Sequence, residues 1–403
     1  MFQSGKFRVF YPSARIIRRL KLALAVCPFF AMIFALLFVI TFVVINVDRS
    51  SLERRSSKRH MAQYSPPETL DEYVERNSVC DVMNATLTQQ VLKFGDNTTI
   101  TVNDTIKDIC VNLTARRQLY FQPQRIRINV FDYDYVIHQK DLCRNRTDIV
   151  VLVHSFHPYF ERRTSIRQTW GGAISKGKWF DNNTIEASIK LVFVMGTHKN
   201  QMLNQEIWRE NQKYHDILQG SFIDDYSNMT LKSLFGLRYV GDFCAGARYL
   251  VKSDDDMIIN FPYLIHLLNS TNMTRAIMGP YNSASKVYRK GKWTLTKQLY
   301  PFYYYPPYES GSAYVISSDL VNPLYQLSQY VPYIFIDDVY ITGILGKILG
   351  VRHIDHAGFA FWTDKQPQPC DVKLNKVVTG TRMLPLDLTL MWNNLTKINC
   401  DTT

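Results

Sequence analysis

Several features that would assign a function at once are missing from the sequence. It holds no G-x-S-x-G and no H-E-x-x-H, the patterns of serine hydrolases and zinc proteases. No C-x-x-C spacing supports a zinc site among its 7 cysteines. No internal repeat, low-complexity stretch or long Gly/Ser or Pro linker divides the 403 residues. What remains is a globular composition, 46% hydrophobic and 20% charged, with room for one large domain or two small ones.

An extended basic surface is also missing, although the formal net charge is +12. Residues 1–60 carry 11 Lys and Arg against 2 acids, which accounts for +9 of that charge. The rest of the chain is close to neutral. The charge therefore does not indicate a protein that binds nucleic acid.

The N-terminal basic residues flank a stretch of 26 residues without charge, Leu22–Val47. At about 1.5 Å per helical residue this run can cross a bilayer, and it exceeds the ~7–15 apolar residues of a secretory signal. We predict a cytoplasmic tail (1–21), a transmembrane signal-anchor (22–47) and a polar stem (48–66). Lys and Arg lie on both sides of the span, so their count barely favours an orientation.

Glycosylation sequons settle the predicted orientation. All ten N-x-[ST] sites follow the span, and N-glycans are added on the lumenal side. We therefore expect a single-pass type II membrane glycoprotein whose residues 48–403 face a secretory lumen. The six cysteines beyond the span suit disulfides there, with 15 pairings open. The predicted glycosylation sites are Asn84, Asn97, Asn103, Asn112, Asn145, Asn182, Asn269, Asn272 and Asn394.

Beyond about residue 148 the pattern predicts an α/β domain. Continuous β-branched runs indicate strands buried on both faces, which is typical of a parallel sheet. Amphipathic segments between the runs indicate helices, and ligands of such sheets bind outside the carboxyl ends of the strands. The predicted strands are 148–155, 188–197 and 247–256, and the predicted helices are 161–170, 201–218 and 229–246.

Three consecutive carboxylates, Asp254, Asp255 and Asp256, end the third predicted strand. Alternate side chains of an extended chain share a face, so Asp254 and Asp256 can converge on one hard cation while Asp255 points away. Mg²⁺ or Mn²⁺ bound by one or two carboxylates completes its shell with phosphate oxygens. An EF-hand is excluded because Ile258 and Ile259 occupy positions where such a loop needs other residues. A solvated acidic loop is the alternative.

A second acidic pair, Asp337 and Asp338, begins a predicted helix. Asp337 fits an N-cap, and a carboxylate held in a cleft also fits a general base. Between the two acidic clusters lies a Tyr-rich segment, 300–317, "YPFYYYPPYESGSAYVIS". Exposed Tyr rings are platforms for sugar faces, and a Tyr-rich core corner is the alternative.

Five motifs occur in one order across about half the chain. They are "ERRTSIRQTWG" (161–171), "LQGSFIDDYSNMTLK" (218–232), "VKSDDDMIIN" (251–260), "YPPYESGSAYVIS" (305–317) and "IDDVYITGILGKILGV" (336–351). Together they resemble the β-1,3-galactosyltransferase family, glycosyltransferase family 31, which also holds β-1,3-N-acetylglucosaminyltransferases. The sequence departs from the family pattern at Ser221, Glu309, Ser312, Ala313 and Asp337.

The resemblance implies a GT-A fold, which is a Rossmann-like mixed α/β sheet with flanking helices. We assign it to 148–370, with 67–147 as a stem-proximal lumenal segment and 371–403 as a C-terminal extension. Members of the family are Golgi enzymes that use a nucleotide sugar and manganese and invert the anomeric centre.

Carried over residue by residue, the motifs imply a role for each matching position. Asp254 and Asp256 are the expected ligands of Mn²⁺ or Mg²⁺, and Asp338 is the expected catalytic base. His356 is either a further metal ligand or a surface histidine, and Asn228 lies in a packed motif that we do not expect to be glycosylated. The implied donor-binding residues are Arg163, Arg167, Trp170, Lys232, Lys252 and Asp255. The implied acceptor-binding residues are Trp293, Tyr305, Tyr308, Ser310, Gly311 and Asp337.

We therefore expect a metal-dependent transfer of galactose from UDP-galactose, in β-1,3 linkage, to a glycan of a glycoprotein or glycolipid. Transfer of N-acetylglucosamine or N-acetylgalactosamine on the same fold is the first alternative, because nothing in the motifs reads C2 or C4 of the sugar. A lumenal lectin-like protein without catalysis is the alternative of another class.

Overall fold

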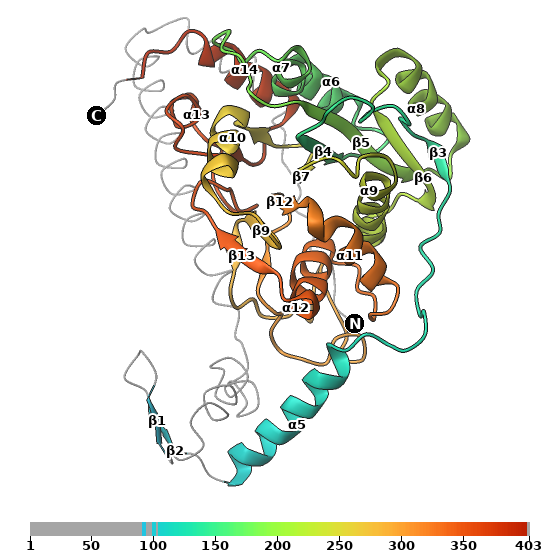
Figure 1. Cartoon of the computed structure of the whole chain (residues 1–403), viewed down its shortest axis with the longest axis vertical. Coiled ribbons are helices and arrows are strands. Elements are labelled where there is room, and N and C mark those ends of the chain that lie inside the picture. Colours follow the sequence, from blue (N-terminus) through green and yellow to red (C-terminus); the bar gives the residue numbers. More distant parts are fainter. Residues whose placement is uncertain (1–90, 94–98, 102–103, 401–403) are drawn as a thin grey trace, which may run out of the picture. The chain divides into compact units, whose positions relative to one another are not determined.

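The computed structural model describes residues 91–93, 99–101 and 104–400 (Figure 1). The predicted tail, membrane span and stem, and the sequons Asn84, Asn97 and Asn103, lie outside these residues. Within the described part, no helix combines the length and apolar character needed to cross a membrane. All described residues belong to one compact unit, Leu70–Thr403. Its first elements are a short antiparallel pair, β1 (Val91–Lys93) with β2 (Thr99–Thr101), and helix α5 (Asp104–Tyr120).

An eight-stranded sheet with the order β13-β9-β12-β7-β4-β5-β6-β3 forms the centre of the domain. Four neighbouring strands in its middle are parallel, and all side chains of the first of them are buried. This burial on both faces explains why the runs read as continuously apolar. The parallel strands are β4 (Ile149–His154), β5 (Ile189–Thr197), β6 (Ile217–Ile223) and β7 (Tyr249–Asp254).

The other half of the sheet makes it mixed. Strand β12 (Ala313–Ser317) lies between β7 and β9 (Ala276–Gly279) and is antiparallel to both. The edge strands are β13 (Arg352–Asp355), parallel to β9, and β3 (Tyr135–Ile137), antiparallel to β6. The expected mixed α/β sheet with flanking helices is thus confirmed.

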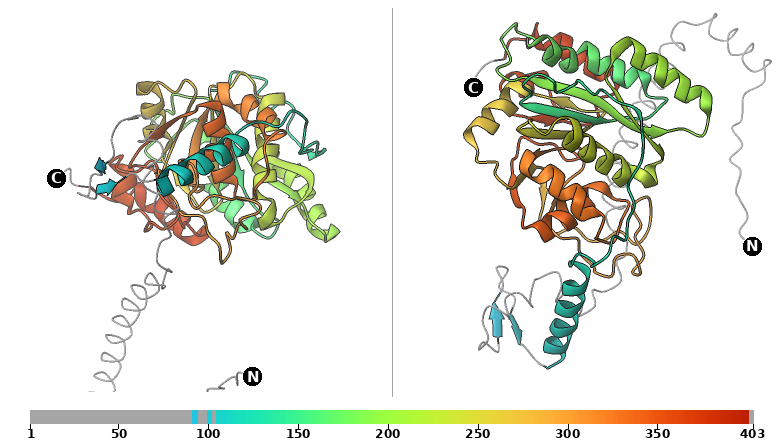
Figure 2. Two further views of the ribbon diagram at one scale, coloured as in Figure 1. Left: turned by 90° about the horizontal axis from the view of Figure 1, so that it is seen from below. Right: turned by 45° about the vertical axis from the view of Figure 1, so that its right-hand side comes forward.

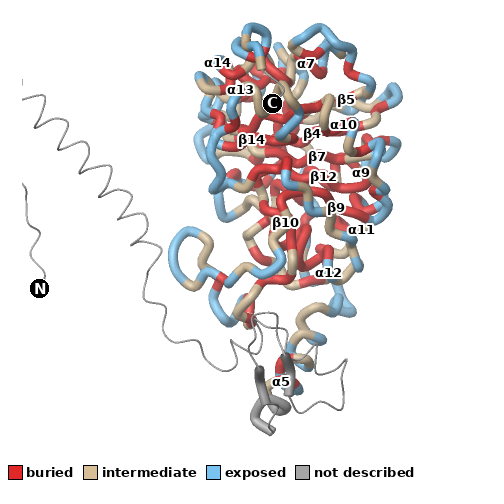
Figure 3. The backbone as a smooth tube through the Cα atoms, turned by 90° about the vertical axis from the view of Figure 1, so that its left-hand side faces the viewer, coloured by how far each residue is buried: buried red, intermediate tan, exposed pale blue. Residues whose placement is uncertain are grey.

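Helices cover both faces of the sheet (Figure 2), and each face has its own apolar core. Alternation along β4 sends Val150 and Leu152 to one core and Val151 and Val153 to the other. The first core is covered by α9 (Met229–Phe243), α11 (Ser318–Ser328), the π-helix η2 (Val339–Leu345) and α12 (Gly346–Leu349). The second is covered by α6 (Phe160–Gln168), α7 (Trp170–Lys176), α10 (Phe261–Ser270) and α14 (Pro385–Leu395). Figure 3 shows the buried sheet between more exposed connections.

Two of the predicted boundaries are corrected. The predicted helix 201–218 ends earlier, because α8 (Gln201–Tyr214) stops before β6 begins at Ile217. The segment 371–403, predicted as an extension, is part of the domain over its described residues. There β14 (Thr379–Gly380) pairs with β8 (Ile258–Ile259), and the buried Leu388 of α14 joins the second core.

Disulfides close two of the connections, as the lumenal interpretation predicts. Cys143, before β4, is bonded to Cys244, which follows α9, across 101 residues of sequence. Cys370, in the short helix α13 (Pro369–Lys373), is bonded to Cys400 beyond α14. Cys110 of α5 is also disulfide-bonded.

Candidate active site

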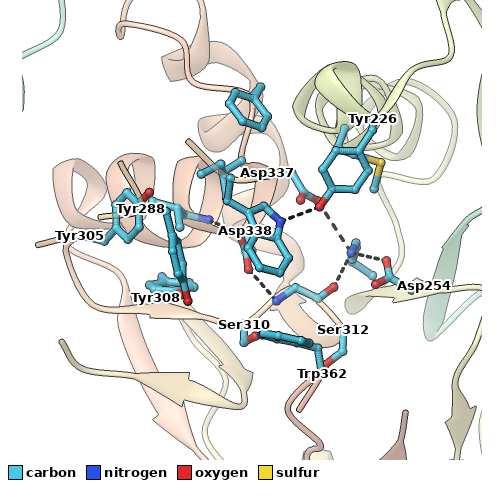
Figure 4. A pocket seen from close by; sticks show the side chains of 17 residues that line it. Tyr226, Asp254, Tyr288, Tyr305, Tyr308, Ser310, Ser312, Asp337, Asp338 and Trp362 are labelled. Atoms are coloured by element: carbon cyan, nitrogen blue, oxygen red, sulfur yellow. Dashed lines mark hydrogen bonds and ion pairs between the residues drawn. The ribbon is translucent and has the colours of Figure 1, made fainter. Parts of the chain in front are cut away.

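A pocket of about 170 Å³ opens where β7, the turn before β12 and the start of η2 meet (Figure 4). These elements come from three distant parts of the sequence and meet because β12 inserts beside β7. The pocket brings together all six predicted acceptor-binding residues, the predicted base Asp338 and the predicted metal ligand Asp254. Of the predicted donor-binding residues, only Lys252 lines it.

The acidic turn is built differently from the extended strand that the sequence suggested. Strand β7 ends at Asp254, and Asp255 and Asp256 form a turn. Asp255 is buried and accepts hydrogen bonds from Ser155 Oγ at 2.7 Å and from Arg162 Nη1 at 2.8 Å. Asp255 therefore stabilises the turn from inside the protein, and its side chain is not accessible to a nucleotide sugar. The side chains of Asp254 and Asp256 stay 38% and 32% exposed, so Asp255 does point away from both, as predicted.

Two further hydrogen bonds, to the backbone carbonyls of this turn, stabilise it. The indole Nε1 of Trp170 donates to Met257 O at 3.0 Å, and Met383 N donates to Asp256 O at 2.8 Å. Arg162 also lies 3.8 Å from the Asp256 carboxylate. The predicted donor residue Trp170 is thus a fully buried support of the turn.

One lysine joins the acidic groups of the pocket. Lys252 Nζ lies 2.7 Å from Asp254 Oδ1 and 3.8 Å from Asp337 Oδ2, and it donates to Gly311 O. Asp337 also accepts from Ser233 Oγ at 2.8 Å. Burial, opposed by Lys252 and reinforced by neighbouring acids, raises the pKa of Asp254 to about 6. Three carboxylates with one lysine leave the pocket short of positive charge.

Asp338, the predicted catalytic base, has its carboxylate held by two backbone amides. Its Oδ2 accepts from Gly311 N at 2.8 Å and its Oδ1 from Val339 N at 2.8 Å, which fixes both oxygens at the pocket wall. The second bond makes Asp338, and not Asp337, the residue that caps η2. Burial, followed by the neighbouring charge of Asp337, raises the pKa of Asp338 to about 7.

Aromatic rings form the mouth of the pocket. Trp293 Nε1 donates to Tyr226 Oη at 2.6 Å, and the rings of Tyr288 and Trp362 lie 5.5 Å and 5.3 Å from that of Trp293. Tyr226, Tyr288 and Trp362 are 44%, 47% and 52% exposed, so part of each ring is accessible from solvent. Tyr305 and Tyr308 are more deeply buried, as a packed corner would be. The Tyr-rich segment 300–317 is thus mainly a packed corner, and the exposed rings at the mouth come from other parts of the chain.

The remaining predicted donor residues lie in packed ion pairs. Arg163 is fully buried, and its donors are taken by Glu210, Ser155 and the carbonyls of Phe156 and His157. It has no N–H left for a diphosphate. Its role here is to fix α6 to α8.

Arg167 and Lys232 follow the same pattern. Arg167 makes two hydrogen bonds to Asp216 and an ion pair with Glu210 at 2.7 Å. The buried Lys232 donates to Ser155 O at 2.7 Å and pairs with Asp224 at 2.8 Å. The Lys232 contact anchors the loop after β4, and Ser155 of that loop donates to Asp255.

Two accessible carboxylates fit a hard divalent cation. Asp254 and Asp256 both reach the surface, and the pKa of each is raised by burial and by like charge, so a cation would relieve an existing strain. His356 does not line the pocket; its Nδ1 accepts from Gly358 N at 3.1 Å. No group of three or more His, Cys, Asp and Glu able to hold a metal occurs among the described residues.

The sequons that the structure describes are mostly exposed. Asn228 is the exception: it is half-buried, and its Nδ2 donates to Ile223 O at 2.9 Å beside the pocket residues Tyr226 and Met229. The exposed ones are Asn112, Asn145, Asn182, Asn269, Asn272 and Asn394.

Sequence reasoning missed Arg162, Ser233 and Trp362. Arg162 stands next to Arg163 in the first motif, so its charge was visible there. Ser233 and Trp362 carry no signal of their own, because only the fold brings them to Asp337 and Trp293.

The comparisons with known proteins agree with this geometry. A family model described as Galactosyltransferase matches residues 161–357. The chain is 31% identical to beta-1,3-galactosyltransferase 1 of Homo sapiens over 289 residues, which are 70% of this chain and 85% of the relative. It is 33% identical to beta-1,3-galactosyltransferase 5 of Pan paniscus, over 60% of this chain and 82% of the relative.

Similarity to solved structures is more distant. The WbbM bifunctional glycosyltransferase has a TM-score of 0.30 and 11% identity, covering 71% of this chain and 53% of that one. Mouse xyloside xylosyltransferase 1 has a TM-score of 0.27 and 11% identity, covering 52% and 84%. The evidence for a family therefore comes from the sequence relatives.

Proposed function

The chain belongs to the β-1,3-galactosyltransferase family, and on that premise we propose that it transfers galactose from UDP-galactose, in β-1,3 linkage and with inversion, to an acceptor glycan. Membership makes it a glycosyltransferase; the donor sugar, the linkage and the acceptor are the proposal. The observation that carries it is Asp338, a carboxylate with a pKa near neutral, fixed by two amides and facing a pocket with an aromatic mouth.

Asp338 is proposed to take the proton from the acceptor 3-hydroxyl as that oxygen attacks C1 of the sugar. A general base works best when its pKa lies near the working pH, which burial and Asp337 provide. Direct displacement needs no covalent intermediate, so no nucleophilic Ser or Cys is required. The hydrogen bonds from Gly311 and Val339 keep the carboxylate oriented during the transfer.

Asp254 and Asp256 are proposed to hold Mn²⁺ or Mg²⁺ together with the diphosphate of the donor. When bound, the ion supplies Lewis-acid neutralisation of the charge on the UDP leaving group. Lys252 keeps Asp254 oriented toward the pocket, and Arg162 with Asp255 keeps the turn in shape. GT-A is the fold that these features fit best.

The same proposal covers location. The predicted signal-anchor 22–47 and the lumenal sequons support a type II protein of the Golgi membrane, with the described domain in the lumen. The acceptor is then a glycan on a glycoprotein or glycolipid. UDP-N-acetylglucosamine and UDP-N-acetylgalactosamine are the alternative donors.

The test uses the full chain purified in a neutral detergent, with Mn²⁺ and one UDP-sugar at a time: galactose, N-acetylglucosamine, N-acetylgalactosamine or glucose. UDP release is followed with and without a chelator and with a mixture of acceptor glycans. We expect metal-dependent turnover of UDP-galactose.

Asp338→Asn should lose this turnover while binding UDP, and Asp141→Asn, at an exposed carboxylate, should keep it. Turnover of a different UDP-sugar, and not of UDP-galactose, would replace galactose as the proposed donor sugar. Binding of glycans without turnover of any donor would leave a lectin-like protein and overturn the proposal.

A further inference from the structure

A strongly basic hairpin lies beside the pocket, although the domain as a whole is close to neutral. From Met257 to Tyr308 the chain contains no Asp or Glu. Twelve residues of that stretch contain five Lys and Arg. This local excess of positive charge is not apparent from the net charge of the chain. The five residues are Lys286, Arg289, Lys290, Lys292 and Lys297.

The segment that carries these charges is ordered by its own backbone. It joins β10 (Tyr281–Asn282) to β11 (Tyr308–Glu309), which pair with each other. Val287 N donates to Tyr303 O at 2.7 Å, and Tyr305 N donates to Ser285 O at 2.9 Å, so the arms form a hairpin. The basic side chains are therefore presented from a fixed support.

The hairpin is also part of the pocket. Tyr288 and Trp293 from this segment line it, and Lys292 Nζ lies 3.7 Å from the centre of the ring of Tyr226, another lining residue. Lys290 and Lys292 are exposed, and neither forms an ion pair with a carboxylate of the described residues. The Lys292 ammonium thus stands over an aromatic ring at the mouth of the pocket, and Lys290 lies two residues before it on the same hairpin.

The interior of the pocket has the opposite sign. Asp254, Asp337 and Asp338 outnumber Lys252 there. A neutral sugar needs no positive rim, whereas an anionic one must be held away from these carboxylates and attracted at a distance from them. The positive charge of Lys292 beside the aromatic mouth therefore matches an acidic sugar.

Resting on the proposed function, we propose that the acceptor is an anionic glycan, with a carboxylate or a sulfate ester on a sugar near the reacting hydroxyl. The ammonium groups of Lys290 and Lys292 bind the anionic group, while Trp293, Trp362 and Tyr288 pack against the sugar faces. These lysines determine acceptor specificity and take no part in proton transfer.

The hairpin is on the acceptor side of the site. It connects β10 and β11, and β11 leads directly to Ser310 and then to Gly311, whose amide donates to Asp338. The diphosphate of the donor is expected instead at Asp254, at the end of β7. Anionic groups on the acceptor are therefore the better match for Lys290 and Lys292.

The test compares matched acceptors that differ only in one charge: a neutral oligosaccharide, the same one with a single sulfate ester, and the same one with a uronic carboxylate. For the full chain in neutral detergent, kcat/KM for each acceptor is measured with the donor that the first assay identifies. We expect the charged acceptors to be preferred, and added salt to reduce the preference.

The double variant Lys290→Gln/Lys292→Gln should lower the ratio of kcat/KM for charged over neutral acceptor by about threefold to tenfold, as expected for two exposed charge contacts. Lys213→Gln is the matched control, because Lys213 also lies over a tyrosine ring, that of Tyr214, but on α8. It should leave the ratio unchanged.

Direct binding of the same oligosaccharides, followed by tryptophan fluorescence with UDP and Mn²⁺ present, gives a second readout that needs no turnover. Equal affinity for neutral and charged acceptors would overturn the inference, whether or not the protein is a transferase. Lysine-dependent binding to vesicles of anionic lipid, without any preference among the oligosaccharides, would assign the hairpin to a membrane surface instead and would also overturn it. Transfer to neutral and charged acceptors at equal rates would leave the proposed function intact.

Discussion

At the scale of single residues, the environment of Asp338 sets the expected pH dependence of the reaction. Only the deprotonated carboxylate accepts a proton, and burial with the charge of Asp337 raises its pKa to about 7. Activity should therefore rise with pH through that value. At saturating Mn²⁺, kcat/KM should increase about tenfold between about pH 6 and about pH 8.

Replacement of the neighbouring charge checks this assignment. Asp337→Asn removes the like charge that raises the pKa of Asp338, so the ascending limb of the profile should move to lower pH. A limb that stays in place in Asp337→Asn, or one that moves with Mn²⁺ concentration, would assign the titration to another group.

Gly311 is required by the close approach of its backbone to the base. A Cβ atom at this position would lie 3.0 Å from Asp338 Oδ2 and 3.3 Å from its Cβ. Gly311→Ala should displace the carboxylate by a few tenths of an ångström and lower kcat by about tenfold, with little change in stability. Gly241→Ala is the control, since that position in α9 has open space. Equal kcat for both variants would show that the position of Asp338 tolerates the shift.

The structure brings the residues that the resemblance assigns to the acceptor together in one pocket, whereas of those assigned to the donor only Lys252 lines it. Motif resemblance locates positions such as Gly311 and Arg163 equally well, but it does not say whether a position contacts a ligand or packs the core. Arg163 is buried by Glu210, 47 residues away, and this pairing has no local signature. Likewise, the turn at Asp255 is set by Ser155 and Arg162 rather than by the strand that precedes it.

At the scale of elements, the segment around β14 supports the acidic turn. Strand β14 pairs with β8, which directly follows that turn, and Met383 beyond β14 holds Asp256 O. The parallel strands β4, β5 and β7 were readable as apolar runs because most of their side chains are buried, whereas β6, with a polar centre and two exposed side chains, was not predicted. The segment 371–400 was not recognised as part of the domain. Its strand β14 has two residues, and its pairing depends on a partner strand more than 100 residues earlier.

Helix α14 should therefore matter for stability. Leu388 is fully buried, so Leu388→Ala leaves a cavity and should cost about 2–5 kcal/mol in the free energy of unfolding. Leu390, on the same helix, is 51% exposed, and Leu390→Ala should cost much less. Thermal unfolding of the two variants measures the difference. Similar midpoints for both would mean that α14 is not packed into the core as described.

At the scale of the whole molecule, the lumenal assignment joins two independent features. In the proposal, the span 22–47 anchors the chain in a membrane, and the sequons all follow it in the sequence. The described domain agrees, because two complete disulfides close its connections. The hypothesis is therefore that a membrane anchor holds the described domain in a secretory lumen. The presence of N-glycans tests it directly.

The exposed sequons predict which asparagines carry N-glycans when the full chain is made in a eukaryotic secretory system. Enzymatic removal of the glycans converts each modified Asn to Asp, which peptide mass spectrometry detects. We expect conversion within the exposed set, such as Asn145 and Asn182, and none at Asn228. A glycan at Asn228 would break its bond to Ile223 O and crowd the mouth of the pocket beside Tyr226 and Met229. Asn182→Gln should abolish the conversion at that site alone. Absence of conversion at every sequon would place the domain outside the secretory lumen, and occupancy of Asn228 in active enzyme would contradict the assignment of this pocket as the active site.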